Sequence, residues 1–300
     1  MKKLVYRADD IGYTLAFDLG AFRAFDEGIA TSADVMFDSP HTVEALKWLK
    51  ERPWISVGWH RHFWESPVLP AEKVPHMIDE EGRFRWRHRH AEYMAEVPYE
   101  EAYSEFEAEM ARCYEILGRY PDTGMSSFLD IPFERAYMDI CKKYNIALDI
   151  AGRGDGVINP EYAHLNYKSW IIVARDNKKG DFKVDPSMDN AKRVMRDYDL
   201  AYFHEYRPAQ NIMNITWENE DQTIMTGGHP GYLDDHILSE STCSIHRVAE
   251  LQGAISAEVK QWIIDNRIEL VNQRDVLHGT SEYQDHLKEI NSPLWVGNFK

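Results

Sequence analysis

The chain opens with short apolar runs separated by amphipathic segments. The run Leu4 to Tyr6 ends at two aspartates, as expected of a short buried strand. After Thr14, a candidate N-cap, large apolar residues recur at helical spacing at Leu15, Leu19, Phe22 and Phe25. The pattern over the first 62 residues predicts strands over 4–6, 29–37 and 55–62 and helices over 14–28 and 42–50. Strands and helices that alternate at such short intervals predict a parallel sheet with outer helices.

The rest of the chain continues this alternation. It predicts helices over 99–117, 192–199 and 255–267, a strand-helix unit over 124–144, and strands over 146–150, 200–204, 223–226 and 268–271. Ser256 is the candidate cap of the helix over 255–267. The sum is an α/β fold, an irregular (β/α) barrel of six or seven mostly parallel strands with outer helices.

Residues 67–97 interrupt the alternation. They are rich in charged and aromatic residues without a clean period, which predicts a long loop excursion over one end of the sheet. No internal repeat or low-complexity linker divides the chain, so we expect one domain over 1–276. Residues 277–300 are expected to form a C-terminal tail on the surface.

Composition narrows the class of protein. The 300 residues carry a formal net charge of −16, which argues against a basic nucleic-acid surface. No run approaches 18 apolar residues, and charges begin too early for a signal peptide. The three cysteines form no CxxC pair, which argues against a zinc knuckle or disulfide framework. We expect a cytoplasmic protein with no nucleic-acid or membrane partner.

Two adjacent carboxylates, Asp9 and Asp10, lie where the first strand meets a loop. Active sites of parallel α/β proteins lie at this end of the strands. Neighbouring strand residues point to opposite faces, so the pair forms no symmetric clamp. A turn would let one carboxylate bind a metal while the other reaches a bound water. The alternative is a pair of acids that caps the helix beginning near Thr14.

Two histidines form a second cluster. His60 and His62 are two residues apart late in a predicted strand and therefore face the same side. Imidazole is a standard ligand of divalent metals. Gly58 leaves space on that face through which a metal or substrate could approach. The alternative is two core histidines.

A third candidate is His229, in a turn rich in glycine and proline that follows a predicted strand. Such a turn holds the imidazole at a fixed angle. An imidazole of this kind is a candidate general acid. The alternative is a turn that merely contains a histidine.

Seven short motifs follow one another along residues 3–276. In chain order they are RADDIG at 7–12, EGIATS at 27–32, VGWH at 57–60, EGRF at 81–84, the region 109–122, HPGY at 229–232 with Asp234, and QRDV at 273–276. In order and in sequence, they resemble seven motifs of the YdjC-like carbohydrate deacetylases, the family of chitooligosaccharide deacetylase. The family's motifs are ADDFG, xGIVTS, xGxH, a loop signature, a helix ending in GxxPT, HPGYxD and YRD(V/L).

The resemblance implies a metal-dependent hydrolase that removes the acetyl group from an N-acetylated mono- or oligosaccharide. It also implies an irregular α/β barrel and a homodimer. Asp10 and His60 would be ligands of a divalent ion, magnesium or zinc. Asp9 would be the base that deprotonates the metal-bound water, and His229 would be the acid near the leaving amine. A divalent ion lowers the pKa of its water, to about 7 for zinc, and this agrees with the roles.

One segment departs from the family. The family's third ligand is the first histidine of a THxDSHHHxH segment, but here Thr123 begins TGMSSFLDI and Phe128 stands at the ligand position. Phenylalanine cannot coordinate a metal. Asp130, two residues further along the predicted strand, is the candidate oxygen ligand, and His62 is a candidate nitrogen ligand. Further candidates are His204 and Glu205.

The lost histidines leave two other functions open. A non-catalytic sugar-binding relative would stack sugar rings on aromatic side chains, here Trp59, Trp64, Trp86 and Tyr232. Because Phe128 makes the pocket more apolar, a hydrolase of another amide or ester is the third possibility. For the deacetylase we expect His62, Trp59 and Tyr232 to contact the substrate.

Overall fold

The computed structural model describes residues 1–63, 65–85, 93–126, 129–152, 158–170, 206–241 and 243–299. Two compact units divide the chain: unit 1 comprises Met1–Asp9, Thr14–Ser32 and Asn166–Lys300, and unit 2 comprises Asp10–Tyr13 and Ala33–Leu165. The elements predicted at 192–199 and 200–204 lie outside the described residues, as do the candidate residues Trp64, Trp86, Phe128, His204 and Glu205.

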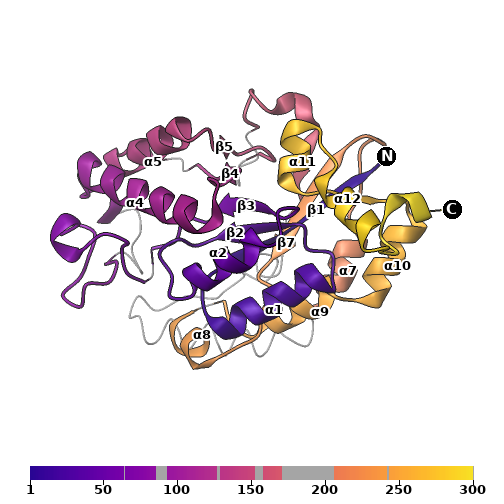
Figure 1. Ribbon diagram of the computed structural model, residues 1–300, viewed down its shortest axis with the longest axis horizontal. Helices are drawn as coiled ribbons and strands as arrows, with labels where there is room; N and C mark the ends of the chain where they lie inside the picture. Colours follow the sequence, from indigo (N-terminus) through magenta and orange to yellow (C-terminus); the bar gives the residue numbers. More distant parts are fainter. Residues whose placement is uncertain are drawn as a thin grey trace, which may run out of the picture. The chain divides into compact units, whose positions relative to one another are not determined.

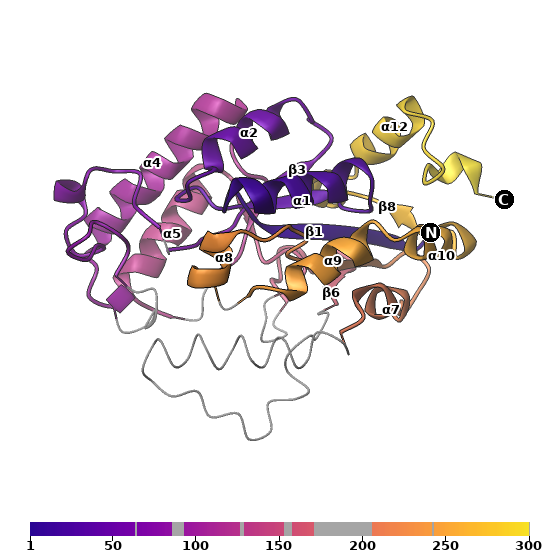
Figure 2. The same cartoon turned by 90° about the horizontal axis from the view of Figure 1, so that it is seen from below.

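Unit 1 is built on the strand β1 (Lys3–Ile11), whose last two residues belong to unit 2. β7 (Thr223–Gly228) and β8 (Glu269–Leu270) pair with β1 in parallel, and β6 (Tyr167–Ser169) pairs in parallel with β7. The helices of unit 1 are α1 (Leu15–Asp26), α7 (Pro208–Met213), α8 (Asp235–Glu240), α9 (His246–Ala254), α10 (Ala257–Asp265), α11 (Gln273–His278) and α12 (Glu282–Glu289), with the 3₁₀ turn η4 (Val296–Asn298). Figure 2 shows α9 close to α7.

Helix α1 begins as predicted, but it buries a different face. The Thr14 hydroxyl accepts the Phe17 amide hydrogen and caps the helix. Leu15 and Leu19, expected to face the core, are 57% and 52% exposed. The buried positions of the helix are Phe17, Asp18, Gly20, Ala21, Ala24 and Phe25. Most of these recur every three or four residues, so the inner face is formed by phenylalanines and alanines and not by the leucines; of the four predicted apolar positions, Phe25 is buried.

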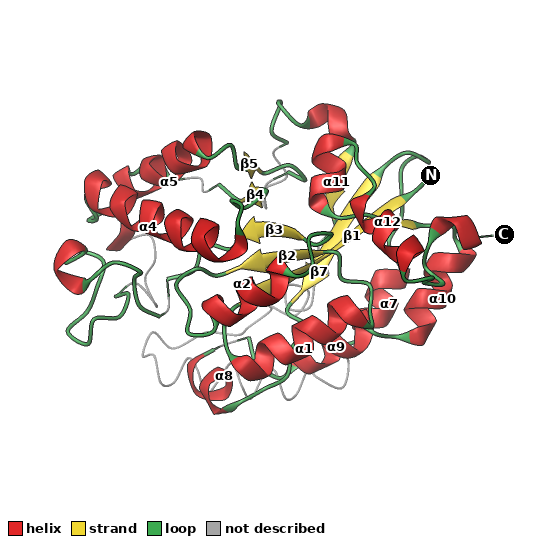
Figure 3. Ribbon diagram, in the orientation of Figure 1, coloured by secondary structure: helices red, strands yellow, loops and turns green. Residues whose placement is uncertain are grey.

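Unit 2 carries the strands β2 (Ser32–Val35), β3 (Ser56–Trp59), β4 (Thr123–Gly124) and β5 (Ala147–Leu148), in the order β5-β4-β3-β2. The pairs β3-β4 and β4-β5 are parallel. The helices are α2 (Thr42–Lys50), α4 (Tyr99–Leu117) and α5 (Pro132–Lys143), with 3₁₀ turns η1 (Ala71–Lys73) and η2 (Ala163–Leu165). Figure 1 shows α4 and α5 side by side, and Figure 3 separates these helices from the strands by colour.

Aromatic side chains form the core of unit 2. Trp59 lies edge-on to Phe106, with ring centroids 5.5 Å apart, and its centroid is 4.7 Å from that of Tyr137. Glu105 enters this interior from α4 and accepts the amide hydrogens of Val68 and Leu69. A buried carboxylate on the helix thus anchors the start of the predicted loop excursion, whose described residues contain η1 and the isolated bridge between Ile78 and Phe84.

The α/β class, with parallel strands and outer helices, is confirmed. Helices α2 and α4 have the predicted bounds, and Ser256 caps α10 as predicted. The strands are shorter than their apolar runs: β2 covers four of the nine residues from 29 to 37, and β3 ends at Trp59. Helices α7, α8, α9, α11 and α12 were not predicted. No helix in the described part of the chain is long and apolar enough to cross a membrane.

The segment expected to be a tail contains α12 and packs onto unit 1. Tyr283 and Leu287 are buried, and the Tyr283 hydroxyl donates to the carbonyl of Ala30. Gln284 donates to the carbonyl of Leu270, at the end of β8. The end of the chain is therefore part of the core of unit 1, because α12 presents an apolar face at helical spacing.

Candidate functional site

Three side chains meet in unit 2 at the carboxyl ends of their strands. Asp10 lies near the end of β1, Asp34 lies in β2, and His60 follows β3 directly. Backbone hydrogen bonds join the strand ends beside them: Met36 N–H donates to the carbonyl of Ile11, and His60 N–H donates to the carbonyl of Val35. The carboxyl edge of a parallel sheet thus brings together residues from three separate segments.

Asp10 has an unusual backbone. Its φ is 63°, in the left-handed region that residues other than glycine seldom adopt. Aspartate tolerates this region better than most residues. The carboxylate of Asp10 lies beside the ring of His60, whereas the carboxylate of Asp9 pairs with Arg7.

His60 lies between two carboxylates. Its Nε2 is 3.0 Å from Oδ1 of Asp10, and its Nδ1 is 3.1 Å from Oδ2 of Asp34. Burial by itself lowers the pKa of His60, but hydrogen bonds and charge from Asp10 and Asp34 outweigh it and raise the pKa to about 10. The ring keeps 24% of its surface exposed, so it is accessible from solvent.

Gly58 provides the room for this arrangement. A Cβ at position 58 would lie 2.2 Å from Oδ1 of Asp34, far inside van der Waals contact. The space predicted for a metal or substrate is therefore filled by the carboxylate that supports His60. Asp34 itself was not predicted as a site residue, and the only signal for it was one acid within an apolar run.

The other predicted residues of unit 2 are placed differently. Although β3 ends before either histidine, the ring of His62 is stacked beside that of His60, with centroids 6.3 Å apart. Trp59 is 1% exposed and its Nε1 donates to Glu109, so it is a core residue that no substrate reaches in this structure. Asp130 is exposed and pairs with Arg135. Because β4 ends at Gly124, strand alternation cannot place Asp130 on the predicted face.

Asp9 is held by an arginine. In unit 1 the Arg7 guanidinium donates from Nε and Nη2 to the two carboxylate oxygens of Asp9, at 2.6 and 2.9 Å. Such a bidentate pair fixes the orientation of a carboxylate. Each oxygen still has a lone pair available to accept a proton.

His229 is supported from α9. Its backbone N–H donates to Oε2 of Glu250 at 2.5 Å, and its Nδ1 is 3.4 Å from the same oxygen. The Tyr206 hydroxyl donates to the other oxygen of Glu250. Burial raises the pKa of Glu250, but the His229 side chain, His246 and the His229 amide lower it to about 2. Tyr232, three residues after His229, is 37% exposed, and its hydroxyl accepts a hydrogen bond from Arg23.

The chain as a whole matches one family model. The model describes YdjC-like proteins and covers residues 3–265. This chain belongs to the YdjC-like family. The resemblance inferred from the seven motifs is thereby confirmed.

Relatives match the chain over most of its length and most of theirs. A carbohydrate deacetylase of Brevibacillus brevis is 27% identical over 273 residues, which is 90% of this chain and 97% of the relative. A carbohydrate deacetylase of Enterococcus faecalis is 26% identical over 280 residues, with 90% and 97% covered. A crystal structure from Enterococcus faecalis, described as a candidate cellobiose-phosphate cleavage protein, has a TM-score of 0.63 at 23% identity and covers 92% of this chain and 98% of that one. That structure shows a shared fold.

The family resemblance implies a divalent ion, and the donors of this YdjC-like chain fit one in part. A carboxylate (Asp10) and an imidazole (His60) converge, and Asp34 supports the far nitrogen of the imidazole, as carboxylates do behind metal-binding histidines. Among the described residues, no three His, Cys, Asp or Glu side chains form a metal-binding group. Catalytic zinc takes three protein ligands, whereas magnesium binds one or two carboxylates and retains several waters. The described donors, one carboxylate and one imidazole, are one protein ligand short of a catalytic zinc site, and an imidazole is not a typical ligand of magnesium.

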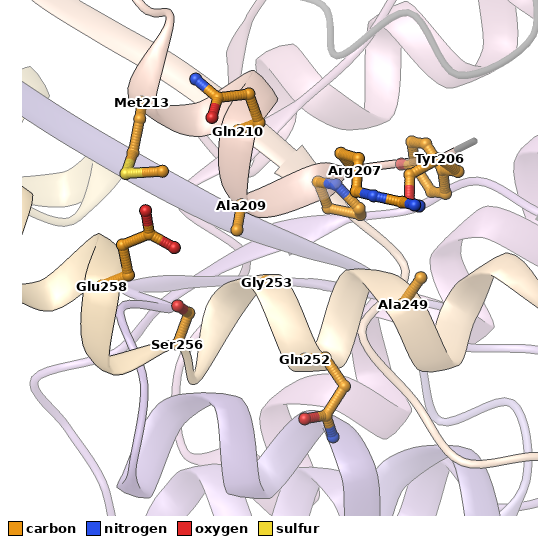
Figure 4. Close-up of a pocket in the computed structure, with 11 residues that line it drawn as sticks. Tyr206, Arg207, Ala209, Gln210, Met213, Ala249, Gln252, Gly253, Ser256 and Glu258 are labelled. Atoms are coloured by element: carbon orange, nitrogen blue, oxygen red, sulfur yellow. The ribbon is translucent and has the colours of Figure 1, made fainter. Parts of the chain in front are cut away.

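A separate pocket of about 460 Å³ lies in unit 1 of the YdjC-like chain. Figure 4 shows Gln210 and Met213 from α7 opposite Ser256 and Glu258. Its lining contains none of the predicted site residues. It includes Tyr206, which links it to Glu250.

Proposed function

We propose that this YdjC-like chain hydrolyses the acetamide group of an N-acetylated mono- or oligosaccharide, with a divalent ion, magnesium or zinc, held by Asp10 and His60. The observation that supports this most directly is the convergence of Asp10, His60 and Asp34 in a member of this family. The names of the relatives, carbohydrate deacetylases, provide the class of substrate.

The proposed reaction uses three further residues of the chain. When bound, the ion polarises the acetyl carbonyl and lowers the pKa of water. Asp9, oriented by Arg7, accepts a proton from the water as the oxygen of that water bonds to the carbonyl carbon. The carbon–nitrogen bond then breaks, and His229 protonates the leaving nitrogen. The products are acetate and a free amino sugar.

Supporting residues give these groups their geometry. Glu250 accepts the backbone N–H of His229, and the same carboxylate oxygen lies 3.4 Å from Nδ1 of the ring, which favours a ring orientation with Nδ1 towards Glu250. Asp34 holds His60 so that Nε2 faces Asp10. We propose that His62 and Tyr232 contact the sugar. We also propose a cytoplasmic homodimer that binds neither nucleic acid nor membranes; the net charge of −16 supports the absence of a nucleic-acid partner.

The test is acetate release from N-acetylglucosamine and its short oligomers by the purified protein supplied with magnesium or zinc. We expect acetate and free amine in equal amounts, and a loss of at least 100-fold in kcat/KM for Asp10→Asn and His60→Gln. Asp26→Asn, an acid at the end of α1, is the control and should retain activity. An absence of acetate from every N-acetylated sugar, with either ion, would refute the proposal.

The same preparation separates the two alternative functions. Calorimetry that detects sugar binding without turnover would identify a sugar-binding relative. The burial of Trp59 removes one of the aromatic residues that motivated this alternative. Turnover of another amide or ester, with none of acetylated sugars, would identify a hydrolase of a different substrate class.

A further inference from the structure

The three cysteines of the chain lie in different surroundings. Cys113 and Cys141 are buried in unit 2, where burial raises the pKa of each thiol to about 12. Cys243, in unit 1, is partly exposed and lies between α8 and α9. It therefore differs from the other two in access to solvent.

Groups that are or can become cationic surround Cys243 from two elements. From α9, Nε2 of His246 lies 3.0 Å from the sulfur, and Arg247 donates from Nε to the Cys243 carbonyl at 2.6 Å. From the turn after β7, His229 forms a hydrogen bond with the Cys243 side chain. The nearby acid, Glu250, is engaged by His229 and Tyr206.

This arrangement favours the ionised thiol. Burial alone raises the pKa of Cys243, but Arg247, His229 and His246 outweigh it and hold the pKa well below its usual value. The thiolate is the nucleophilic form of cysteine, and a neighbouring imidazole is a common means of activating it.

We propose that Cys243, paired with His246, is a nucleophilic thiolate and a site of covalent modification by peroxides and other soft electrophiles. The inference goes beyond the proposed function, because it holds whether or not the chain deacetylates sugars. Neither Cys243 nor His246 has a role in the proposed hydrolysis.

The Cys243 thiolate would react with two reagents, iodoacetamide and hydrogen peroxide. With iodoacetamide, the sulfur bonds to the methylene carbon, the carbon–iodine bond breaks, and iodide leaves. With hydrogen peroxide, the sulfur bonds to one oxygen and the oxygen–oxygen bond breaks. The departing hydroxide takes a proton from the His246 imidazolium and leaves as water. Peroxide is the oxidant, and Cys243 is oxidised to a sulfenic acid.

The first test is the pH dependence of iodoacetamide labelling of the intact native protein, followed at each cysteine by peptide mass spectrometry. We expect Cys243 to react at least tenfold faster than Cys113 and Cys141, the buried controls within the same chain. Its rate should fall less than threefold from pH 8 to pH 6, whereas a thiol with a pKa of about 8.5 would slow roughly 75-fold.

Two variants and a second reagent complete the test. His246→Gln should slow labelling of Cys243 at pH 6 more than at pH 8, and Cys243→Ser should abolish it. Peroxide followed by dimedone should add dimedone at Cys243 and not at the buried thiols. Labelling of Cys243 at the rate of Cys113, or a rate that follows an ordinary thiol between pH 6 and 8, would overturn the inference.

Discussion

The His60 ring is held from both sides, by Asp10 at Nε2 and by Asp34 at Nδ1. A carboxylate behind a metal-binding histidine sets which nitrogen is presented and how the ring is turned. The His60 ring is partly exposed and the Asp34 carboxylate is buried. This suits His60 as the proposed metal ligand and Asp34 as the residue that positions its ring.

Asp34→Asn is the variant that tests this role. We expect affinity for magnesium, measured by calorimetry, or kcat/KM for acetate release to fall about 10- to 100-fold. Asp122→Asn is the matched control. Asp122 is another carboxylate of unit 2, which accepts from Ser56 and Val57, and its loss should lower stability without changing ion affinity. Equal ion affinities in wild type and Asp34→Asn would remove Asp34 from the site.

Glu109 offers a test of buried charge. Burial raises the pKa of this carboxyl well above its usual value, and the neighbouring acids Glu105 and Asp38 raise it further. The folded state therefore favours the neutral form. The stability this provides is fully present below the unfolded-state pKa of about 4.3 and is lost as pH rises towards the folded-state value.

We therefore expect Glu109→Gln to stabilise the protein more at pH 8 than at pH 5. The difference between the two pH values should be about 1 kcal/mol or more, since each pKa unit corresponds to about 1.4 kcal/mol. Chemical denaturation at both pH values measures it, with the exposed Glu44→Gln as control. A shift of the same size at pH 5 and pH 8 would contradict a raised pKa for Glu109.

At the scale of elements, β3 supports the site through a residue without a side chain. Gly58 lies in β3, and the neighbouring strand β2 places Asp34 against it. The approach depends on the absence of a Cβ. A strand glycine thus couples the packing of two strands to the orientation of His60.

Gly58→Ala should displace the Asp34 carboxylate and uncouple it from His60. We expect a loss of at least tenfold in kcat/KM for acetate release, with the far-UV circular dichroism preserved. Gly82→Ala is the comparison: nothing lies within 4 Å of its added Cβ, and only its positive φ of 76° adds strain. If Gly58→Ala keeps full activity, the contact between β2 and β3 does not position His60.

At the scale of the whole molecule, the chain consists of two compact units, each with its own buried core. α12 illustrates how far the core of unit 1 extends along the chain. Its Leu287 is 5% exposed, whereas Ile290, which follows the same helix, is 54% exposed. Proteins open locally as well as globally, so each core can be weakened separately.

Leu287→Ala should lower the free energy of unfolding by about 2–5 kcal/mol, because it leaves a cavity. Ile290→Ala, the control from the end of the same helix, should change it by about 0.5 kcal/mol or less. Hydrogen exchange should accelerate in unit 1, at β8 and α1, more than in unit 2. Equal acceleration in both units would mean that the chain opens as one cooperative body.

Prediction from the sequence succeeded where local rules apply. The helices over 42–50 and 99–117 and the caps at Thr14 and Ser256 follow from periodicity and from hydrogen-bonding side chains. Asp130 could not be placed, because its strand ends six residues earlier. Trp59 was expected to contact a substrate, and its burial depends on Phe106 and Tyr137, which are distant in sequence.

The amino-acid sequence by itself determined the α/β class, the family and the pair Asp10 and His60, because apolar periodicity and short motifs are encoded locally. Only the tertiary structure decided that Asp34 fills the space beside Gly58 and holds His60, and that Cys243 lies among His229, His246 and Arg247. Those contacts join segments that are far apart along the chain. Their geometry depends on where separate strands and helices end, and local sequence patterns do not specify this to within an atom's width.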